Sequence, residues 1–188
     1  MDLHIISECY IDTKLIKTIA PPTHKKGYNH QKGCTNVIKM MQEKLTNDFA
    51  VGVMDKDKRV LDYVKYFDWV AGLENQLELW KHPNKPHYLI FICPAVEKWL
   101  LLCADEVNIP LTDFGLPHDF LKLQKITKTA KSEDNDPFSN QLKQLFKSLQ
   151  KNGARNIIIL AYWITYLKSM PYDADLNEIK KMTQSLIE

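Results

Sequence analysis

The chain has 188 residues, of which 45% are apolar and 26% charged, and its formal net charge is +2. This composition is typical of one globular domain, or one domain with an appendage, that buries a sizeable core. The small net charge gives no general reason to expect nucleic-acid binding, and no apolar run is long enough to span a bilayer, so we expect no membrane partner.

The first part of the chain alternates short apolar runs with helical patterns. Residues 3–7 are expected to form a buried strand, and residues 12–20 a helix that ends at two prolines. A loop rich in Lys, His and Gly follows over residues 21–33. A second helix over residues 35–45 then leads into a second buried strand over residues 49–54.

The next part continues this alternation. Residues 59–70 have apolar side chains at helical spacing and are expected to form a third helix, whereas residues 72–86 are ambiguous. Residues 87–93 (HYLIFIC) are expected to form a third strand, and a helix is expected over residues 95–105, just after Pro94. Strands that alternate with helices predict a parallel sheet with helical crossovers.

From residue 106 onward the sequence predicts loops and helices but no convincing strand. Residues 157–160 could form a last strand, but their continuation into further apolar and aromatic residues favours a buried helix. We therefore expect an α/β domain over residues 1–105 and a helical extension over residues 106–188 that packs on it. The helices expected in this extension are residues 118–127, 139–151, 156–168 and 175–187.

The four cysteines are scattered, and no two have the Cys-x-x-Cys spacing of a structural zinc site. Cys93 and Cys103 stand in apolar surroundings and are expected to be buried thiols. This cysteine usage, with no visible signal peptide, favours a reducing, cytoplasmic location.

Acidic residues follow each expected strand. Glu8 ends the first apolar run, Asp55 and Asp57 end the second, and Glu97 lies in the first turn of the helix after the third. Because the carboxyl ends of parallel strands meet at one edge of a sheet, we expect these carboxylates to converge. Like charges there repel unless they are protonated or share a cation, and oxygen ligands favour Mg²⁺ or Mn²⁺. A solvated turn is the alternative explanation for the Asp-Lys-Asp-Lys segment.

Three motifs carry a resemblance to a known family. Glu8-Cys-Tyr-Ile-Asp12 resembles the Glu-Gly-x-x-Asp motif that ends the first strand of Toprim domains, and Asp55-Lys-Asp57 resembles their Asp-x-Asp motif. Glu97-Lys-Trp-Leu resembles the Glu-x-Trp-Leu signature of stand-alone Toprim-like nucleases. The resemblance covers about residues 1–105 and points to nucleases of the overcoming-lysogenization-defect type and related phage-defence proteins.

This resemblance implies a Toprim-like, Rossmann-like α/β fold and a metal-dependent nuclease acting on DNA or RNA. Glu8 would be the catalytic acid or base, or a metal ligand, while Asp55 and Asp57 would hold Mg²⁺ or Mn²⁺ and Glu97 would complete the coordination shell. The larger defence nucleases of this type carry an ATPase. Because this sequence has no P-loop motif, an ATPase would have to act in trans, or the protein would work without one.

The chain departs from the family pattern at Cys9, where the family has a glycine that permits a tight turn and close approach of the backbone to phosphate. A non-catalytic Toprim-like module that binds nucleic acid or a partner protein is therefore the alternative. Asp12 matches the motif but is also explained as a helix cap. Enzymes of the haloacid-dehalogenase type also use Asp-x-Asp, but after their first strand and with Thr or Val where this chain has Arg59.

Several lysines are candidates for contact with a nucleic-acid backbone, since lysine supplies charge without sequence preference. Lys32 belongs to the basic loop, and Lys56 and Lys58 flank the paired aspartates. Each could bind substrate phosphates, or could simply be solvated or balance local charge. In the C-terminal part, lysines recur every four residues from Lys143 to Lys151, and a solvated face explains them equally well. The C-terminal helices could also form a homodimer contact.

Overall fold

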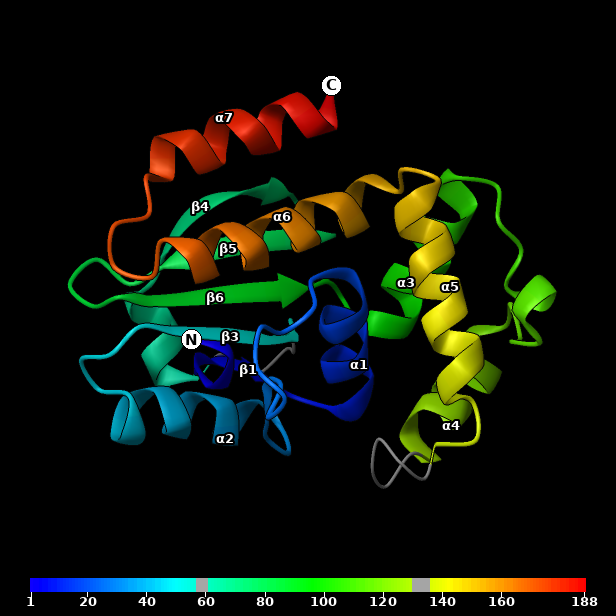
Figure 1. Ribbon diagram of the computed structural model, residues 1–188, viewed down its shortest axis with the longest axis horizontal. Coiled ribbons are helices and arrows are strands. Elements are labelled where there is room, and N and C mark those ends of the chain that lie inside the picture. The colour runs from blue at the N-terminus through cyan, green and yellow to red at the C-terminus, as the bar shows by residue number, and fades with distance from the viewer. Residues whose placement is uncertain (57–60, 130–135) are drawn as a thin grey trace.

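One sheet runs through the centre of the protein (Figure 1). In the residues that the computed structural model describes, 1–56, 61–129 and 136–188, six strands lie in the order β2-β1-β3-β6-β5-β4. The strands are β1 (Ile5–Ser7), β2 (Asn29–His30), β3 (Ala50–Asp55), β4 (Asp68–Leu73), β5 (Leu77–Lys81) and β6 (His87–Ile92). The first four in spatial order are parallel, whereas β5 and β4 are antiparallel to their neighbours. The mixed α/β class is thus confirmed, with a sheet that is mostly parallel.

The three strands expected from apolar runs form the middle of this sheet. Strand β3 pairs with β1 on one side and with β6 on the other, and all six residues of β3 are in register with β6. Every residue of β6 is buried, as are the first five residues of β3. Near-continuous apolar runs are expected for parallel strands that are covered on both faces, which explains why the sequence identified them.

The helix expected over residues 59–70 is wrong. Its described part contains one 3₁₀ turn, η3 (Asp62–Tyr66), then Phe67 and the start of β4. The ambiguous stretch 72–86 contains β5, which forms a hairpin with β4 through a turn in which Asn75 has a φ of 60°. Asparagine tolerates this left-handed conformation better than most residues. The two-residue strand β2 was also missed, because it is too short to have a hydrophobic pattern.

Side chains alternate between two cores on opposite faces of the sheet. Val51 and Val53 point into the larger core, on what we call the large-core face. Ala50 and Met54 point into the smaller core, on the small-core face, where α2 and η3 pack. The helices of the N-terminal part are α1 (Tyr10–Ile19), α2 (Cys34–Lys39), which continues as a π-helical turn η2 (Met40–Lys44), and α3 (Val96–Glu106).

The C-terminal part is helical, as expected. It contains η4 (Leu111–Phe114), α4 (Phe120–Thr129), α5 (Ser139–Lys151), α6 (Arg155–Ser169) and α7 (Leu176–Ile187), so residues 157–160 are helical. Buried side chains of α5 and α6 belong to the same large core as those of β1, β3 and β6. Trp163 of α6 is fully buried and donates a hydrogen bond to Thr183 of α7 (2.8 Å), which ties the last helix to the core.

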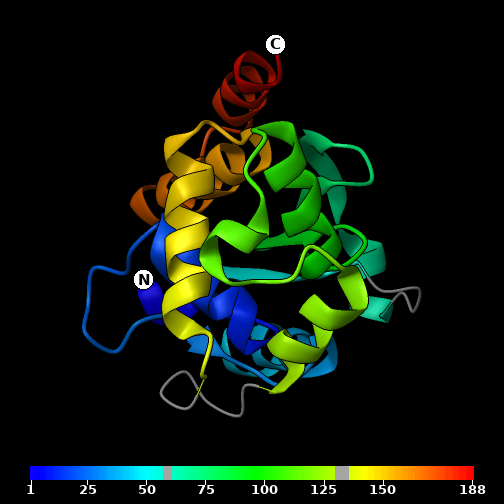
Figure 2. The same cartoon turned by 90° about the vertical axis from the view of Figure 1, so that its right-hand side faces the viewer.

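The carboxyl ends of the parallel strands point toward one end of the molecule. In Figure 1 the arrowheads of β3 and β6 face the end that carries α1, α3, α4 and α5, and Figure 2 shows this end from the front. Helices from both halves of the sequence therefore surround the edge at which the sequence predicts the functional site. None of the helices in the described part of the chain is long and apolar enough to cross a membrane.

Candidate active site at the carboxyl edge of the sheet

The strand order creates a crevice at the ends of β1 and β3. These two strands are neighbours, but the chain leaves β1 toward the outer strand β2 and leaves β3 toward the opposite side of the sheet. In open α/β sheets such a switch point leaves space at the carboxyl ends of the strands, where ligands bind. Glu8, which directly follows β1, and Asp55, the last residue of β3, are therefore placed at this crevice by the topology.

Hydrogen bonds from the backbone connect these two residues. The Glu8 N–H donates to the carbonyl of Val53 (3.0 Å), which continues the pairing of β1 with β3, and the Asp55 N–H donates to Glu8 Oε2 (3.2 Å). Asp55 Oδ1 in turn accepts the backbone N–H of Val96 (2.9 Å), at the start of α3. The ends of β1 and β3 and the start of α3 are thereby held together around Asp55.

Asp12 brings a third carboxylate to the same place. It lies in the first turn of α1 and is 1% exposed. Its Oδ2 accepts hydrogen bonds from the Cys9 N–H (3.2 Å) and from the Cys9 thiol (3.0 Å), so the helix-cap explanation of Asp12 is confirmed. Its buried Oδ1, however, has no hydrogen-bond partner among the described residues. A cap alone would not require that second oxygen to be buried without a partner.

Glu97 is the fourth acidic residue, in the first turn of α3, and is 5% exposed. Its Oε1 accepts a hydrogen bond from the Thr127 hydroxyl (2.5 Å), which α4 contributes. Glu97 is therefore fixed by the C-terminal part of the chain. No feature of the sequence pointed to Thr127 as its partner.

The four carboxylates interact electrostatically. Burial, followed by the charges of Asp12, Glu8 and Glu97, raises the pKa of Asp55 from 3.8 to about 8. Burial, reinforced by Glu8 and Glu97 and opposed by the hydrogen bonds from Cys9, raises the pKa of Asp12 to about 7. The pKa of the Cys9 thiol is also raised, chiefly by burial and then by Asp12. At neutral pH this cluster of acids therefore holds protons or needs a neighbouring cation.

The residues present fit a hard divalent cation by two criteria. All four side chains offer carboxylate oxygens, and the Oδ1 of Asp12 is buried without a partner. Within residues 1–56, 61–129 and 136–188, no three Asp, Glu, His or Cys side chains are already arranged to hold an ion. Mg²⁺ usually keeps several waters and binds through one or two carboxylates, so it does not require a preformed cage of three side chains.

The basic loop lies against the same edge. The Gln31 N–H donates to the carbonyl of Ser7 (2.9 Å), and the Gly33 N–H donates to the carbonyl of Glu8 (3.2 Å). Lys32, between these two anchors, has an exposed side chain. The predicted phosphate-binding residue is thus held beside the end of β1.

Lys56, the other predicted phosphate-binding residue in the described part of the chain, has a different partner. Lys56 forms an ion pair with Glu78 of β5, with Nζ at 2.7 Å from both carboxylate oxygens. Asp57, a predicted metal ligand, and Lys58, a predicted phosphate contact, lie outside the described residues.

Glu78, which is 2% exposed, was missed by sequence reasoning. The signal was its position between Leu77 and Leu79, since alternation in a strand places it on the face opposite both leucines.

Other expectations about single residues are confirmed. Cys93 and Cys103 are buried free thiols. Comparisons with known proteins add no assignment, because no protein-family model, no curated protein and no solved structure matches this chain. The functional conclusion therefore depends on the residues and their geometry.

Proposed function

We propose that this protein is a metal-dependent enzyme that cleaves phosphodiester bonds, a nuclease with a Toprim-like acidic site. The observation that carries the proposal is the convergence of Glu8, Asp12 and Asp55 at the switch point between β1 and β3, with one buried carboxylate oxygen left without a partner. The Toprim-like motifs in the sequence support the same conclusion, because these are the residues in which the resemblance lies.

Each residue has a role in this proposal. A divalent cation held by Asp55, with Asp12 or Glu8, would polarise the phosphodiester and stabilise the charge that develops on the leaving oxygen. Glu8, whose Oε2 accepts the Asp55 N–H (3.2 Å), would hold or transfer a proton at this edge. Asp57 and Glu97 remain the further predicted ligands. Lys32 would bind a neighbouring phosphate through its exposed ammonium group.

The experiment is a cleavage assay on single-stranded and duplex DNA and RNA, with Mg²⁺, Mn²⁺ or EDTA. We expect cleavage that needs the metal and that falls by at least about a hundredfold in Asp55→Asn and Glu8→Gln, a loss on the scale of one transition-state contact. The matched control is Asp173→Asn, which changes an exposed aspartate that the structure does not place in the cluster. Full activity in both site variants, or activity that survives EDTA, would refute the proposal.

A second candidate function is favoured by one specific contact. The Cys9 thiol donates to Asp12 Oδ2 (3.0 Å), so the residue that replaces the family glycine occupies one oxygen of a proposed ligand. This favours a non-catalytic module that binds nucleic acid or a partner protein. Cys9→Gly separates the two functions: if the wild type is inactive and the variant gains metal-dependent cleavage, the wild-type protein is the binding module. Under both functions the proposed partners are an ATPase that acts in trans and a second copy of this chain in a homodimer.

A further inference from the structure

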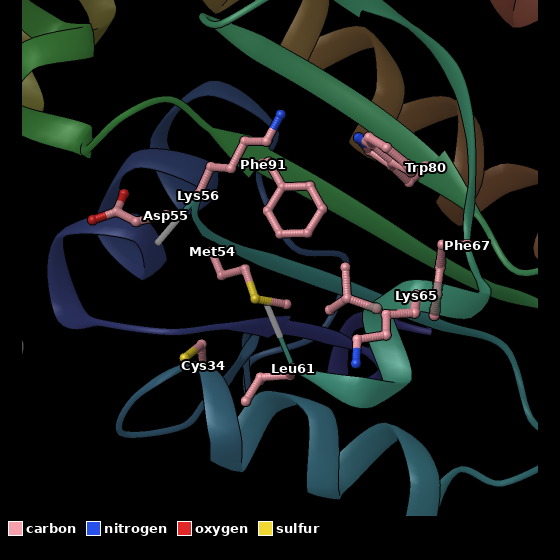
Figure 3. Close-up of a pocket in the computed structure, with 10 residues that line it drawn as sticks. Cys34, Met54, Asp55, Lys56, Leu61, Lys65, Phe67, Trp80 and Phe91 are labelled. Atoms are coloured by element: carbon pink, nitrogen blue, oxygen red, sulfur yellow. The ribbon is translucent and has the colours of Figure 1, made fainter. Parts of the chain in front are cut away.

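A pocket opens on the small-core face directly beside the acidic cluster (Figure 3). Its volume is about 280 Å³. Met54, Phe91 and Trp80, from three neighbouring strands, line the side toward the sheet, and Phe67 and other residues around η3 line the opposite wall. Asp55 lines the pocket as well, so the pocket and the acidic cluster share a residue.

We propose that this pocket receives one unstacked nucleobase of a nucleic-acid strand whose adjoining phosphate lies at the acidic cluster. The inference depends on the proposed function for the position of that phosphate, and it goes further by naming the substrate class as single-stranded nucleic acid. A base inside a duplex is stacked and paired, and enters a pocket only after it has been flipped out.

The walls suit a flat aromatic group. The rings of Trp80 and Phe91 have centroids 6.3 Å apart and are inclined at 88°, so a planar ligand that stacks on one ring meets the edge of the other. Proteins that bind single strands without sequence preference use such aromatic side chains as stacking platforms. The volume lies near the lower limit of ligand pockets, about 300 Å³, and therefore suits one small ring system better than a peptide segment.

Two lysines stand at the rim of the pocket, and each is held in an ion pair, Lys56 with Glu78 and Lys65 with Asp62 (2.7 Å). Lys56 and Lys65 line the pocket together with its apolar residues, and the Lys56 ammonium lies 5.9 Å from the centre of the Trp80 ring. The buried Glu78 fixes both Lys56 and Trp80, because it accepts the Trp80 indole N–H (2.9 Å) as well as the lysine ammonium. The stacking ring and one cation are therefore already positioned before a ligand binds.

The geometry of β3 connects the pocket to the cluster. Met54 and Asp55 are successive residues of this strand, and successive side chains point to opposite faces. Figure 3 shows the Met54 side chain turned into the pocket and the Asp55 carboxylate turned away from it. A single strand of nucleic acid that crosses the end of β3 can thus place a phosphate at the carboxylates. The base attached to that phosphate would then lie against Met54 and Phe91.

The test measures binding in Ca²⁺, which takes oxygen ligands but tolerates a looser geometry than Mg²⁺, and the labelled strand is checked to be uncleaved after each titration. The probes are a short fluorescent single-stranded DNA, the same strand with abasic residues in place of its nucleotides, and the corresponding duplex. We expect the wild type to bind the natural strand about tenfold more tightly than the abasic strand, in line with one stacked base. Trp80→Leu should lose this preference without weakening the binding of the abasic strand.

The matched control is Trp69→Leu, since Trp69 pairs with Trp80 across β4 and β5 but is 53% exposed and does not line the pocket. It should keep the tenfold preference. Val64→Phe, which fills the pocket from η3 instead of removing a ring, should abolish the preference by a different physical route. Thermal melting of each variant separates the loss of the pocket from the loss of the fold.

The outcomes distinguish this inference from the proposed function. Equal binding of natural and abasic strands by the wild type, or a preference that survives both Trp80→Leu and Val64→Phe in folded protein, would overturn the inference even if metal-dependent cleavage is found. That result would favour an apolar group of a partner protein as the ligand of the pocket. A base-dependent preference in a protein without cleavage activity would support the pocket while the proposed function fails.

Discussion

Replacing Asp12 with asparagine should stabilise the protein in the absence of metal and weaken its response to metal. The side chain is 1% exposed, and burial together with the charges of Glu8 and Glu97 raises its pKa from 3.8 to about 7. A folded-state pKa above the unfolded value means that stability is lost as pH rises from about 4 to about 7. Near pH 8 the ionised Asp12 therefore carries its full unfavourable contribution.

The magnitude follows from the same values. A rise in pKa from 3.8 to about 7 corresponds to roughly 4 kcal/mol. The asparagine amide lacks the charge but adds N–H groups that need partners, at a cost of about 1–3 kcal/mol. The expected net gain is thus about 2 kcal/mol, or a melting temperature raised by about 4–8 °C for a chain of this size.

The assay is thermal unfolding followed by circular dichroism near pH 8, in EDTA and then in excess Mg²⁺ or Mn²⁺. A metal present at about one hundred times its dissociation constant should stabilise the wild type by roughly 2.7 kcal/mol, and Asp12→Asn should show a much smaller gain. Asp173→Asn serves as the control for loss of one exposed charge. The reasoning is refuted if Asp12→Asn melts below the wild type in EDTA and gains as much from metal, because Asp12 would then act only as a helix cap.

Three further predictions concern the same fold. Because the pKa of Asp55 is raised to about 8, the metal-free protein should melt at a lower temperature near pH 8.5 than near pH 6.5, and excess Mg²⁺ should narrow this difference; an unchanged melting temperature would contradict the prediction. Thr183→Val leaves the buried N–H of Trp163 without an acceptor and should lower stability by about 1–3 kcal/mol in urea unfolding, whereas Thr183→Ser should retain most of it. Gly52→Ala places a methyl group 2.9 Å from a Leu89 side-chain carbon and should lower stability by about 1 kcal/mol, and a stabilised variant would show that the small core has unfilled space.

The sequence could predict those parts of the fold that leave a strong local pattern. Strands β1, β3 and β6 are apolar runs because the sheet buries them on both faces, and the long amphipathic helix α5 is periodic because only one side faces the core. The β4–β5 hairpin has no such pattern, since its first two residues are exposed and a bulge interrupts the alternation. Apolar residues around η3 happen to match helical spacing, and the strand β4 that follows is specified only by its pairing with β5, which in turn pairs with β6.

The sequence could predict which acidic residues belong to the candidate site, but it could not predict the order of the strands that brings them together. The sequence shows that Glu8, Asp55 and Glu97 follow apolar runs, but it does not show which runs become neighbours. The order β2-β1-β3-β6 joins Glu8 to Asp55 through one hydrogen bond (3.2 Å) and places the start of α3 against Asp55. Asp12 is a candidate for the site only because it is buried. A capping aspartate on an exposed helix would keep an ordinary pKa and would contribute to stability only as a cap.

The pocket beside the cluster depends on long-range pairing even more strongly. Trp80 and Phe91 are brought together by the antiparallel pairing of β5 with β6, and Glu78 can hold Lys56 only because β5 lies beyond β6 in the sheet. If the acidic cluster and this pocket bind one ligand, then Glu78→Gln, which weakens the hold on Lys56 and Trp80, should reduce the affinity for the natural single strand but leave metal binding at Asp55 unchanged. Loss of both would mean that Glu78 supports the whole edge of the sheet, because removing the buried charge would then disturb β3 as well as the pocket.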